Sequence, residues 1–131
     1  MKEKKNNLYE YFNDLYSKDF INRFIINYPN FNRAVILFGD SLIYKINTVY
    51  KLKEVLEKKN NVGIELISLY SENIVPIDKV RYVINWVNLR SKDLKIVFID
   101  LENLNVYSLN ALLKTIEEPP DGVLFFMSKV N

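Results

Sequence analysis

The chain has 131 residues, and 49% of them are hydrophobic, which suits one compact domain with a buried core. Lysine and arginine number 18 against 16 acidic residues, so the net charge of +2 does not by itself indicate nucleic acid or a membrane surface. The absence of cysteine and histidine excludes disulfides, Cys/His zinc sites, thiol nucleophiles and histidine-based triads. No apolar run approaches the roughly 20 residues that cross a bilayer, and no signal core follows the charged start. We expect a cytoplasmic protein without a membrane partner.

The first third of the chain alternates between helical and strand patterns. Residues 7–28 show helical spacing in two pieces that meet near residues 17–19, and Pro29 ends this stretch. The continuous apolar run 34–38 predicts a buried strand. Helical spacing returns over residues 45–59. This order of elements is the start of an alternating helix and strand pattern.

The rest of the chain continues this alternation. We expect a strand at 64–70, a helix from an N-cap at Asp78 to about Arg90, a strand at 96–99 ending in Asp100, a helix at about 105–118, and a strand at 123–127. Strands that alternate with helices predict an α/β fold with a parallel sheet flanked by helices. Such sheets bind ligands at the carboxyl ends of their strands. Gly39 and Asp100 follow or end strands, so they mark the edge at which a site is expected.

The turn after the first strand has the position and spacing of a phosphate-binding loop. Such a loop reads Gly-x4-Gly-Lys-Ser/Thr, and Gly39 and Lys45 fit it. Tyr44 stands at the second glycine, where a side chain restricts backbone closure on phosphate, and Ile46 replaces the hydroxyl that binds Mg²⁺. The other interpretation is an ordinary turn in which Lys45 packs its stem along the helix and keeps its head in water. Weak phosphate binding by Lys45 stays open.

The strand that ends in Asp100 is similar to the metal-coordinating strand of nucleotide hydrolases. Those enzymes follow the aspartate with a glutamate that orients the attacking water, but here Leu101 follows and Glu102 comes one position later. A shift by one residue at a strand end turns the side chain another way. The alternative is that Asp100 is a capping or loop carboxylate.

One helix carries a string that helix stability alone does not require. It reads Asn110-Ala-Leu-Leu-Lys-Thr-Ile-Glu-Glu-Pro-Pro120 and has Leu109, Leu112, Leu113 and Ile116 as its apolar face. The string resembles the signature helix of bacterial DNA polymerase III clamp-loader subunits of the gamma and delta-prime families, which differs from it only in having leucine at position 116. The signature residues implied by this resemblance are Asn110, Ala111, Leu112, Leu113, Lys114, Thr115, Glu117, Glu118 and Pro119.

Two flanking segments support the resemblance. Residues 77–81, followed by Trp86, are similar to the family's Val-Asp-x-Ile-Arg helix, and residues 33–39 are similar to its His-Ala-Tyr-Leu-Phe-x-Gly strand, with Arg33 in place of histidine. The resemblance implies a single AAA+ amino-terminal domain over residues 1–131, with a P-loop NTPase-like core at 31–131 and leading helices at 1–30. Lid and collar domains are then expected beyond the end of this chain.

Departures from the family's pattern favour one member of it. The loop lacks its second glycine and hydroxyl, and Asp100 lacks the following glutamate. Loss of one charge-stabilising or water-orienting group typically costs on the order of a hundredfold in rate. The resemblance therefore implies the non-hydrolysing delta-prime subunit, with no catalytic residue, no required cofactor and no zinc. The degenerate nucleotide site comprises Gly39, Tyr44, Lys45, Ile46 and Asp100.

The resemblance also implies partners. These are gamma/tau-type ATPase subunits, the delta subunit, and primed DNA in the assembled complex. Lys79, Arg81 and Lys114 are candidates for contacts with the DNA backbone, against the alternative of solvated surface cations. Glu117 and Glu118 either pair across a subunit boundary or are solvated at the helix end, and Ser128 and Asn131 resemble a phosphate-sensing strand end. Two other functions stay open: an ATP-binding gamma/tau-like motor subunit, and a protein-binding adaptor that reuses the fold.

Overall fold

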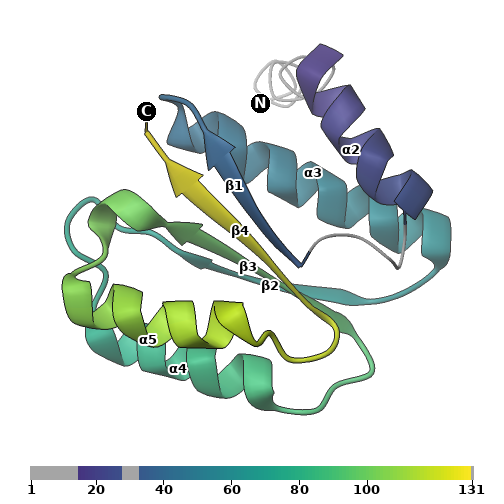
Figure 1. Ribbon diagram of the computed structural model, residues 1–131. Helices are drawn as coiled ribbons and strands as arrows, with labels where there is room; N and C mark the ends of the chain where they lie inside the picture. Colours follow the sequence, from purple (N-terminus) through teal and green to yellow (C-terminus); the bar gives the residue numbers. More distant parts are fainter. Residues whose placement is uncertain (1–14, 28–32, 131) are drawn as a thin grey trace, which may run out of the picture.

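A four-stranded parallel sheet forms the centre of the molecule (Figure 1). The computed structural model describes residues 15–27 and 33–130. The strands are β1 (Ala34–Phe38), β2 (Ile64–Leu69), β3 (Leu94–Asp100) and β4 (Val123–Lys129), and they lie in the order β1-β4-β3-β2. Every neighbouring pair is parallel. The predicted α/β fold with a parallel sheet is confirmed.

Helices cover both faces of the sheet. Helices α2 (Leu15–Asn27) and α3 (Leu42–Asn60) lie on one face, and α4 (Ile77–Asn88) and α5 (Val106–Glu117) lie on the other (Figure 1). A short 3₁₀ turn, η1 (Leu101–Asn103), follows β3. Parallel crossovers are right-handed. The step from β1 to β2 runs across the sheet in the opposite direction to the steps from β2 to β3 and from β3 to β4, so α3 lies on the opposite face to α4 and α5.

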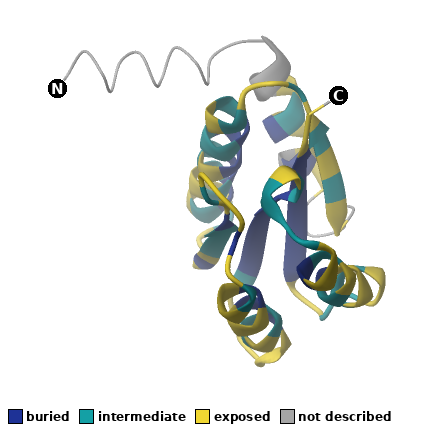
Figure 2. Ribbon diagram, turned by 90° about the vertical axis from the view of Figure 1, so that its left-hand side faces the viewer, coloured by how far each residue is buried: buried dark blue, intermediate teal, exposed yellow. Residues whose placement is uncertain are grey.

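The two central strands explain the apolar character of the sequence. β3 and β4 are buried on both faces over almost their whole length (Figure 2), and strands of this kind need continuous apolar runs. Side chains alternate between two cores. One core, beneath α4 and α5, contains Val80, Val83, Val97, Ile99, Leu112, Phe125 and Met127. The other, beneath α2 and α3, contains Ile21, Phe24, Leu52, Leu56, Ile96, Phe98, Leu124 and Phe126.

The prediction that residues 34–38 form a buried strand is right about the strand and wrong about its burial. The strand forms at the edge of the sheet. Ile36 is opposite Met127 in register and so faces the α4 and α5 side. Even so, Ile36 is 48% exposed and Phe38 is 60% exposed. In the described part of the chain, no strand pairs with the outer edge of β1 and no helix covers these residues. An apolar run cannot tell a central strand from an edge strand.

Element boundaries differ from the predictions where caps decide them. Helix α2 runs without a break through residues 17–19, and α3 begins at Leu42 because Ser41 caps it. Asp78 is not the N-cap of α4, since Pro76 occupies that position and Asp78 lies in the first turn. The predictions for residues 7–14 and Pro29 fall outside the described residues. None of the described helices is long and apolar enough to cross a membrane.

Candidate functional site

The predicted site residues meet at the carboxyl edge of the sheet. Gly39 directly follows β1, and its backbone N–H donates to the carbonyl of Lys129 at the end of β4 at 3.2 Å. Asp100 ends β3 and is opposite Ser128 in register, and both are buried. Lys45 reaches this edge from the first turn of α3. The structure therefore brings together the loop residues and the strand-end aspartate, as the sequence predicted.

The turn between β1 and α3 satisfies its own backbone. Gly39 has φ = +141°, a conformation that favours glycine. Ser41 caps the helix, because its Oγ accepts from the backbone N–H of Tyr44 at 3.1 Å and its carbonyl accepts from the N–H of Lys45 at 3.2 Å. In a phosphate-binding loop the N–H groups at a helix start point at the phosphate oxygens. Here the Ser41 side chain occupies one of these groups, the N–H of Tyr44.

The ammonium group of Lys45 is turned inward. Its Nζ donates to the carbonyl of Gly39 at 2.7 Å, to that of Lys129 at 3.3 Å and to that of Leu37 at 3.4 Å. The side chain is only 6% exposed. Neither sequence interpretation described this arrangement, since the head of Lys45 is not in bulk water. The lysine instead links the ends of β1 and β4 to the start of α3.

Burial and nearby charges act on Lys45 in opposite directions. Burial lowers its pKa below the usual 10.5, because removing the ammonium from water disfavours the charged form. The carboxylates of Asp100, Asp40 and Glu102 act the other way and raise the pKa. Burial is the larger effect. The three carboxylates at this edge thus favour the protonated form of Lys45.

Replacing Lys45 with methionine is expected to lower the free energy of unfolding by about 1–2 kcal/mol, because the carbonyls of Gly39 and Leu37 lose a donor. The difference should depend on pH. In the window just below 10.5 the unfolded chain binds more protons at this residue than the folded chain, so this residue's contribution to stability rises with pH. Urea titrations between about pH 8 and 10 should show the native chain gaining stability relative to the variant. A gap that shrinks with pH would contradict this assignment, and Lys59→Met is the matched control on the same helix.

Asp100 acts as a capping carboxylate. Its Oδ1 accepts from the N–H of Glu102 at 3.2 Å, and its Oδ2 accepts from the side-chain amide of Asn103 at 2.8 Å. Asn103 also donates to the carbonyl of Ser71 at 2.8 Å, which ties η1 to the loop after β2. This geometry matches the capping alternative. Among the described residues, no group of three or more acidic side chains is placed to hold a metal ion.

The residues that depart from the phosphate-binding and hydrolase patterns make packing contacts and hydrogen bonds within the protein. Ile46 packs against the core beneath α2 and α3. Tyr44 lines an apolar pocket of about 240 Å³ at the edge of β1, together with Phe20, Leu37 and Phe38. Glu102 contacts the backbone after β4, since its Oε1 accepts from the N–H of Val130 at 3.0 Å. Asn131, the other half of the predicted sensing pair, lies outside the described residues.

The candidate DNA contacts are all on the surface. Lys79 and Lys114 are exposed, and Arg81 lies 3.7 Å from Asp78 in an exposed ion pair. They lie on α4 and α5, which cover the same face of the sheet. Glu117 and Glu118 are exposed and form no ion pair within residues 15–27 and 33–130. Their exposure is compatible with contacts to a partner and equally with solvated side chains.

The signature helix divides into buried and exposed residues. Leu112 and Ile116 pack into the core beneath α4 and α5, and Ala111 and Thr115 are half-buried. Leu113 was predicted on the apolar face but is 38% exposed, so that prediction is wrong. It lies about 100° around the helix from Leu112 and falls beyond the packed stripe. Asn110 is exposed as well.

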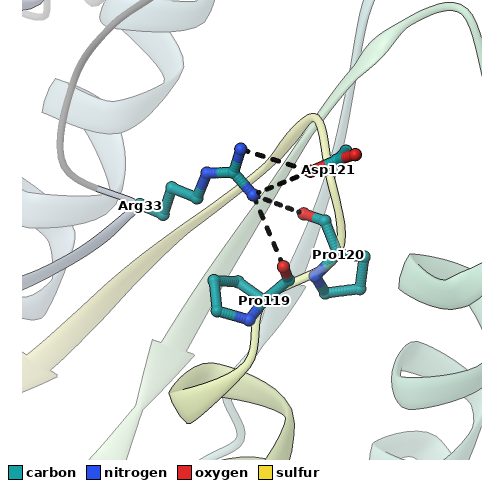
Figure 3. Close-up of polar contacts among 4 residues, drawn as sticks. All are labelled: Arg33, Pro119, Pro120 and Asp121. Atoms are coloured by element: carbon teal, nitrogen blue, oxygen red, sulfur yellow. Dashed lines mark hydrogen bonds and ion pairs between the residues drawn. The ribbon is translucent and has the colours of Figure 1, made fainter.

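Arg33 holds the turn after the signature helix (Figure 3). Its guanidinium donates to the carbonyls of Pro119 at 3.4 Å and Pro120 at 3.3 Å, and to the carboxylate of Asp121 at 3.3 Å. The sequence pattern identified Arg33 only as a replacement for histidine. The partners lie more than 80 residues away in the chain, so no local signal identifies them. The cap at Ser41 was also missed, although a serine before an apolar helical pattern is a usual start signal.

Comparison with known proteins agrees with this architecture. The sequence model of the family described as DNA polymerase III, delta subunit, matches residues 46–131. No curated relative matches the sequence. Solved structures with a similar fold include a gamma subunit-related protein of DNA polymerase III from Thermotoga maritima, with 21% identity, a TM-score of 0.63, and coverage of 87% of this chain and 39% of that one.

Two further solved structures share the fold. PCH-2 from C. elegans has 17% identity and a TM-score of 0.65, and the match covers 91% of this chain and 38% of that one. A chain in the structure of Drosophila ORC bound to poly(dA/dT) DNA and Cdc6 has 11% identity and a TM-score of 0.54, and the match covers 95% of this chain and 26% of that one. The chain thus spans well under half the length of these structures, and at such identities the likeness concerns the fold alone.

Proposed function

The chain belongs to the DNA polymerase III delta-subunit family, and on that premise we propose that it is a non-hydrolysing, delta-prime-like subunit of the clamp loader. In this role it supports the ATP-dependent loading of the sliding clamp onto primed DNA without turning over ATP itself. Gamma/tau-type ATPase subunits and the delta subunit are its proposed partners. It needs no nucleotide, metal or zinc, and it is no enzyme by itself.

The observation that carries this proposal is the position of Lys45. A nucleotide-binding loop needs its lysine free to reach phosphate oxygens. Here the Lys45 ammonium donates to the carbonyls of Gly39, Lys129 and Leu37. A triphosphate would have to break these bonds and displace the Ser41 cap, and the Tyr44 side chain restricts the backbone approach. The lysine stabilises the fold where relatives of this type would hold a ligand.

The rest of the edge supports the same proposal. Both carboxylate oxygens of Asp100 accept hydrogen bonds from the protein, and Ile46 offers no hydroxyl to a metal ion. Leu101 packs against the core beneath α4 and α5 where a water-orienting glutamate would be needed. We infer that a subunit of this kind contributes fixed surfaces to a ring, while ATP binding in neighbouring subunits supplies the conformational change. Lys79, Arg81 and Lys114 are the proposed contacts with the DNA backbone in that ring.

Titration of the full-length protein with a fluorescent ATP analogue and Mg²⁺, checked by calorimetry, tests the proposal. We expect no saturable binding up to about 1 mM nucleotide, which corresponds to a binding free energy weaker than about −4 kcal/mol. Micromolar, Mg²⁺-dependent binding that Lys45→Ala abolishes and Lys59→Ala leaves intact would refute the nucleotide-free assignment. That result would instead favour the gamma/tau-like ATP-binding subunit.

A protein-binding adaptor is the second candidate. The observation that favours it is the exposed apolar edge of β1 with Ile36 and Phe38, because such patches often mark protein contacts. Reconstitution separates the two functions. A delta-prime-like subunit should copurify with gamma/tau-type and delta subunits of its own organism and restore clamp loading on primed DNA. An adaptor should do neither.

A further inference from the structure

Exposed apolar side chains gather at the carboxyl edge of the sheet. This edge includes the ends of the strands and the starts of α3, α4 and α5, and in Figure 2 it faces the viewer. More than half of the large apolar residues exposed in the described chain lie here, with exposed fractions between 42% and 82%. We call them the carboxyl rim: Phe38, Ile43, Tyr70, Ile74, Val106, Tyr107 and Val130. Open parallel sheets bind their ligands at this edge, and an apolar edge suits a protein surface better than a polyphosphate.

The turns that follow the first three strands each expose a carboxylate, whereas the start of α4 adds Lys79 and the exposed pair of Asp78 with Arg81. Asp40, Glu72 and Glu102 are exposed in the turns that follow β1, β2 and β3. Lys129 is the exposed base at the end of β4, while Lys45 is turned into the carbonyls beneath the edge. Like charges repel and opposite charges steer association. The part of the rim beside these three turns therefore disfavours phosphates and suits a partner that carries lysine or arginine.

A pocket adjoins the rim. It has a volume of about 240 Å³, and its lining is mostly apolar, contributed by Phe20, Ile36, Leu37, Phe38, Tyr44, Lys45 and Thr48. Phe38 belongs to both the pocket and the rim, so the two surfaces are continuous. An apolar cavity of about 150 Å³ already holds a benzene ring. The pocket can accept one apolar or aromatic side chain of a docked segment.

We propose that the carboxyl rim is a docking surface for a protein segment that combines apolar side chains with flanking lysine or arginine. One apolar side chain enters the pocket beside Phe38, and the basic residues face Asp40, Glu72 and Glu102. A few buried apolar anchors surrounded by polar contacts are sufficient for a specific interface. The inference rests on the proposed function in one respect, namely that nucleotide does not occupy this edge.

A displayed library of random 12-residue peptides, selected against the full-length protein, tests the docking surface. We expect enriched peptides to combine apolar and basic residues, to bind with Kd below about 100 µM, and to weaken as salt is added. The double variant Ile43→Asp/Tyr107→Asp should weaken them at least about tenfold, because it removes apolar area from the rim. The control Tyr50→Asp/Tyr82→Asp changes exposed tyrosines on α3 and α4 away from the rim and should change Kd less than about twofold. Glu72→Lys should weaken basic peptides while leaving the unfolding transition in place.

Several results would overturn the docking surface. These are a library without enrichment, enrichment of acidic or uncharged peptides, equal effects of the rim and control variants, and self-association of the native chain that the rim variant abolishes. ATP titration of the same samples separates this proposal from the proposed function. Peptide binding together with ATP binding would refute only the nucleotide-free function, and binding of neither would refute only the docking surface. ATP binding without peptide binding would refute both.

Discussion

Replacing Phe126 with alanine is expected to lower the free energy of unfolding by about 4 kcal/mol. Phe126 is fully buried in β4, at the centre of the core beneath α2 and α3. Its ring lies 5.8 Å from that of Phe20 and 5.4 Å from that of Phe24, measured between centroids. The variant loses the buried surface and leaves a cavity that these two rings cannot fill without moving. Because both rings belong to α2, the docking of that helix should weaken as well.

Urea unfolding measures the loss at Phe126, and hydrogen exchange of α2 amides reports whether the helix undocks. Phe126→Leu, which keeps most of the volume, should cost about 1–2 kcal/mol. Phe38→Ala is the matched control on the neighbouring strand, since Phe38 is 60% exposed. It should change stability by less than about 1 kcal/mol. A cost at Phe126 no greater than that at Phe38 would show that α2 and β4 do not share the described core.

Replacing Lys95 with alanine is expected to cost about 3 kcal/mol. Lys95 lies in β3 and is only 4% exposed. Its Nζ donates to the carbonyls of Trp86 and Leu89, each at 2.6 Å, and lies 5.1 Å from the centroid of the Trp86 ring. The ammonium thus donates to carbonyls at the carboxyl end of α4 and places a positive charge there, where a cation is stabilising. Alanine removes the ammonium, the cation–π contact and the packed stem together.

Two variants separate these contributions. Lys95→Met keeps the stem and removes the charge, so it should cost less than alanine, about 1–2 kcal/mol. Lys92→Ala removes an exposed lysine from the turn just before β3 and should be nearly neutral. Trp86 is the single tryptophan of the chain, so its fluorescence reports directly on the end of α4. If Lys95→Ala and Lys92→Ala unfold alike and leave the emission unchanged, Lys95 does not cap the helix.

The signature helix has parts that the described structure explains and parts that it does not. Leu112 and Ile116 are explained by the core, and the carbonyls of Pro119 and Pro120 by Arg33. Nothing in the described structure explains the exposed Asn110, Lys114, Glu117 and Glu118. The roles predicted for Lys114, Glu117 and Glu118 at a partner or subunit boundary stay predictions.

The sequence by itself determined the alternation of strands and helices, because hydrophobic periodicity is a local property. It also identified the departures at Tyr44, Ile46 and Leu101, since those depend only on residue type and spacing. The edge where Gly39, Lys45 and Asp100 meet followed from a general rule of parallel sheets. These inferences needed no knowledge of which strands pair.

Only the tertiary structure decided which strand lies at the edge and what each polar group contacts. The apolar run of β1 reads like that of β4, yet Phe126 is buried between helix and sheet while Phe38 is exposed. Lys45 could have faced solvent or a phosphate, but the structure turns it toward the carbonyls of Gly39, Leu37 and Lys129, the last of them 84 residues away in the chain. Strand order and hydrogen-bond partners depend on contacts between distant segments, and a local pattern carries no information about those.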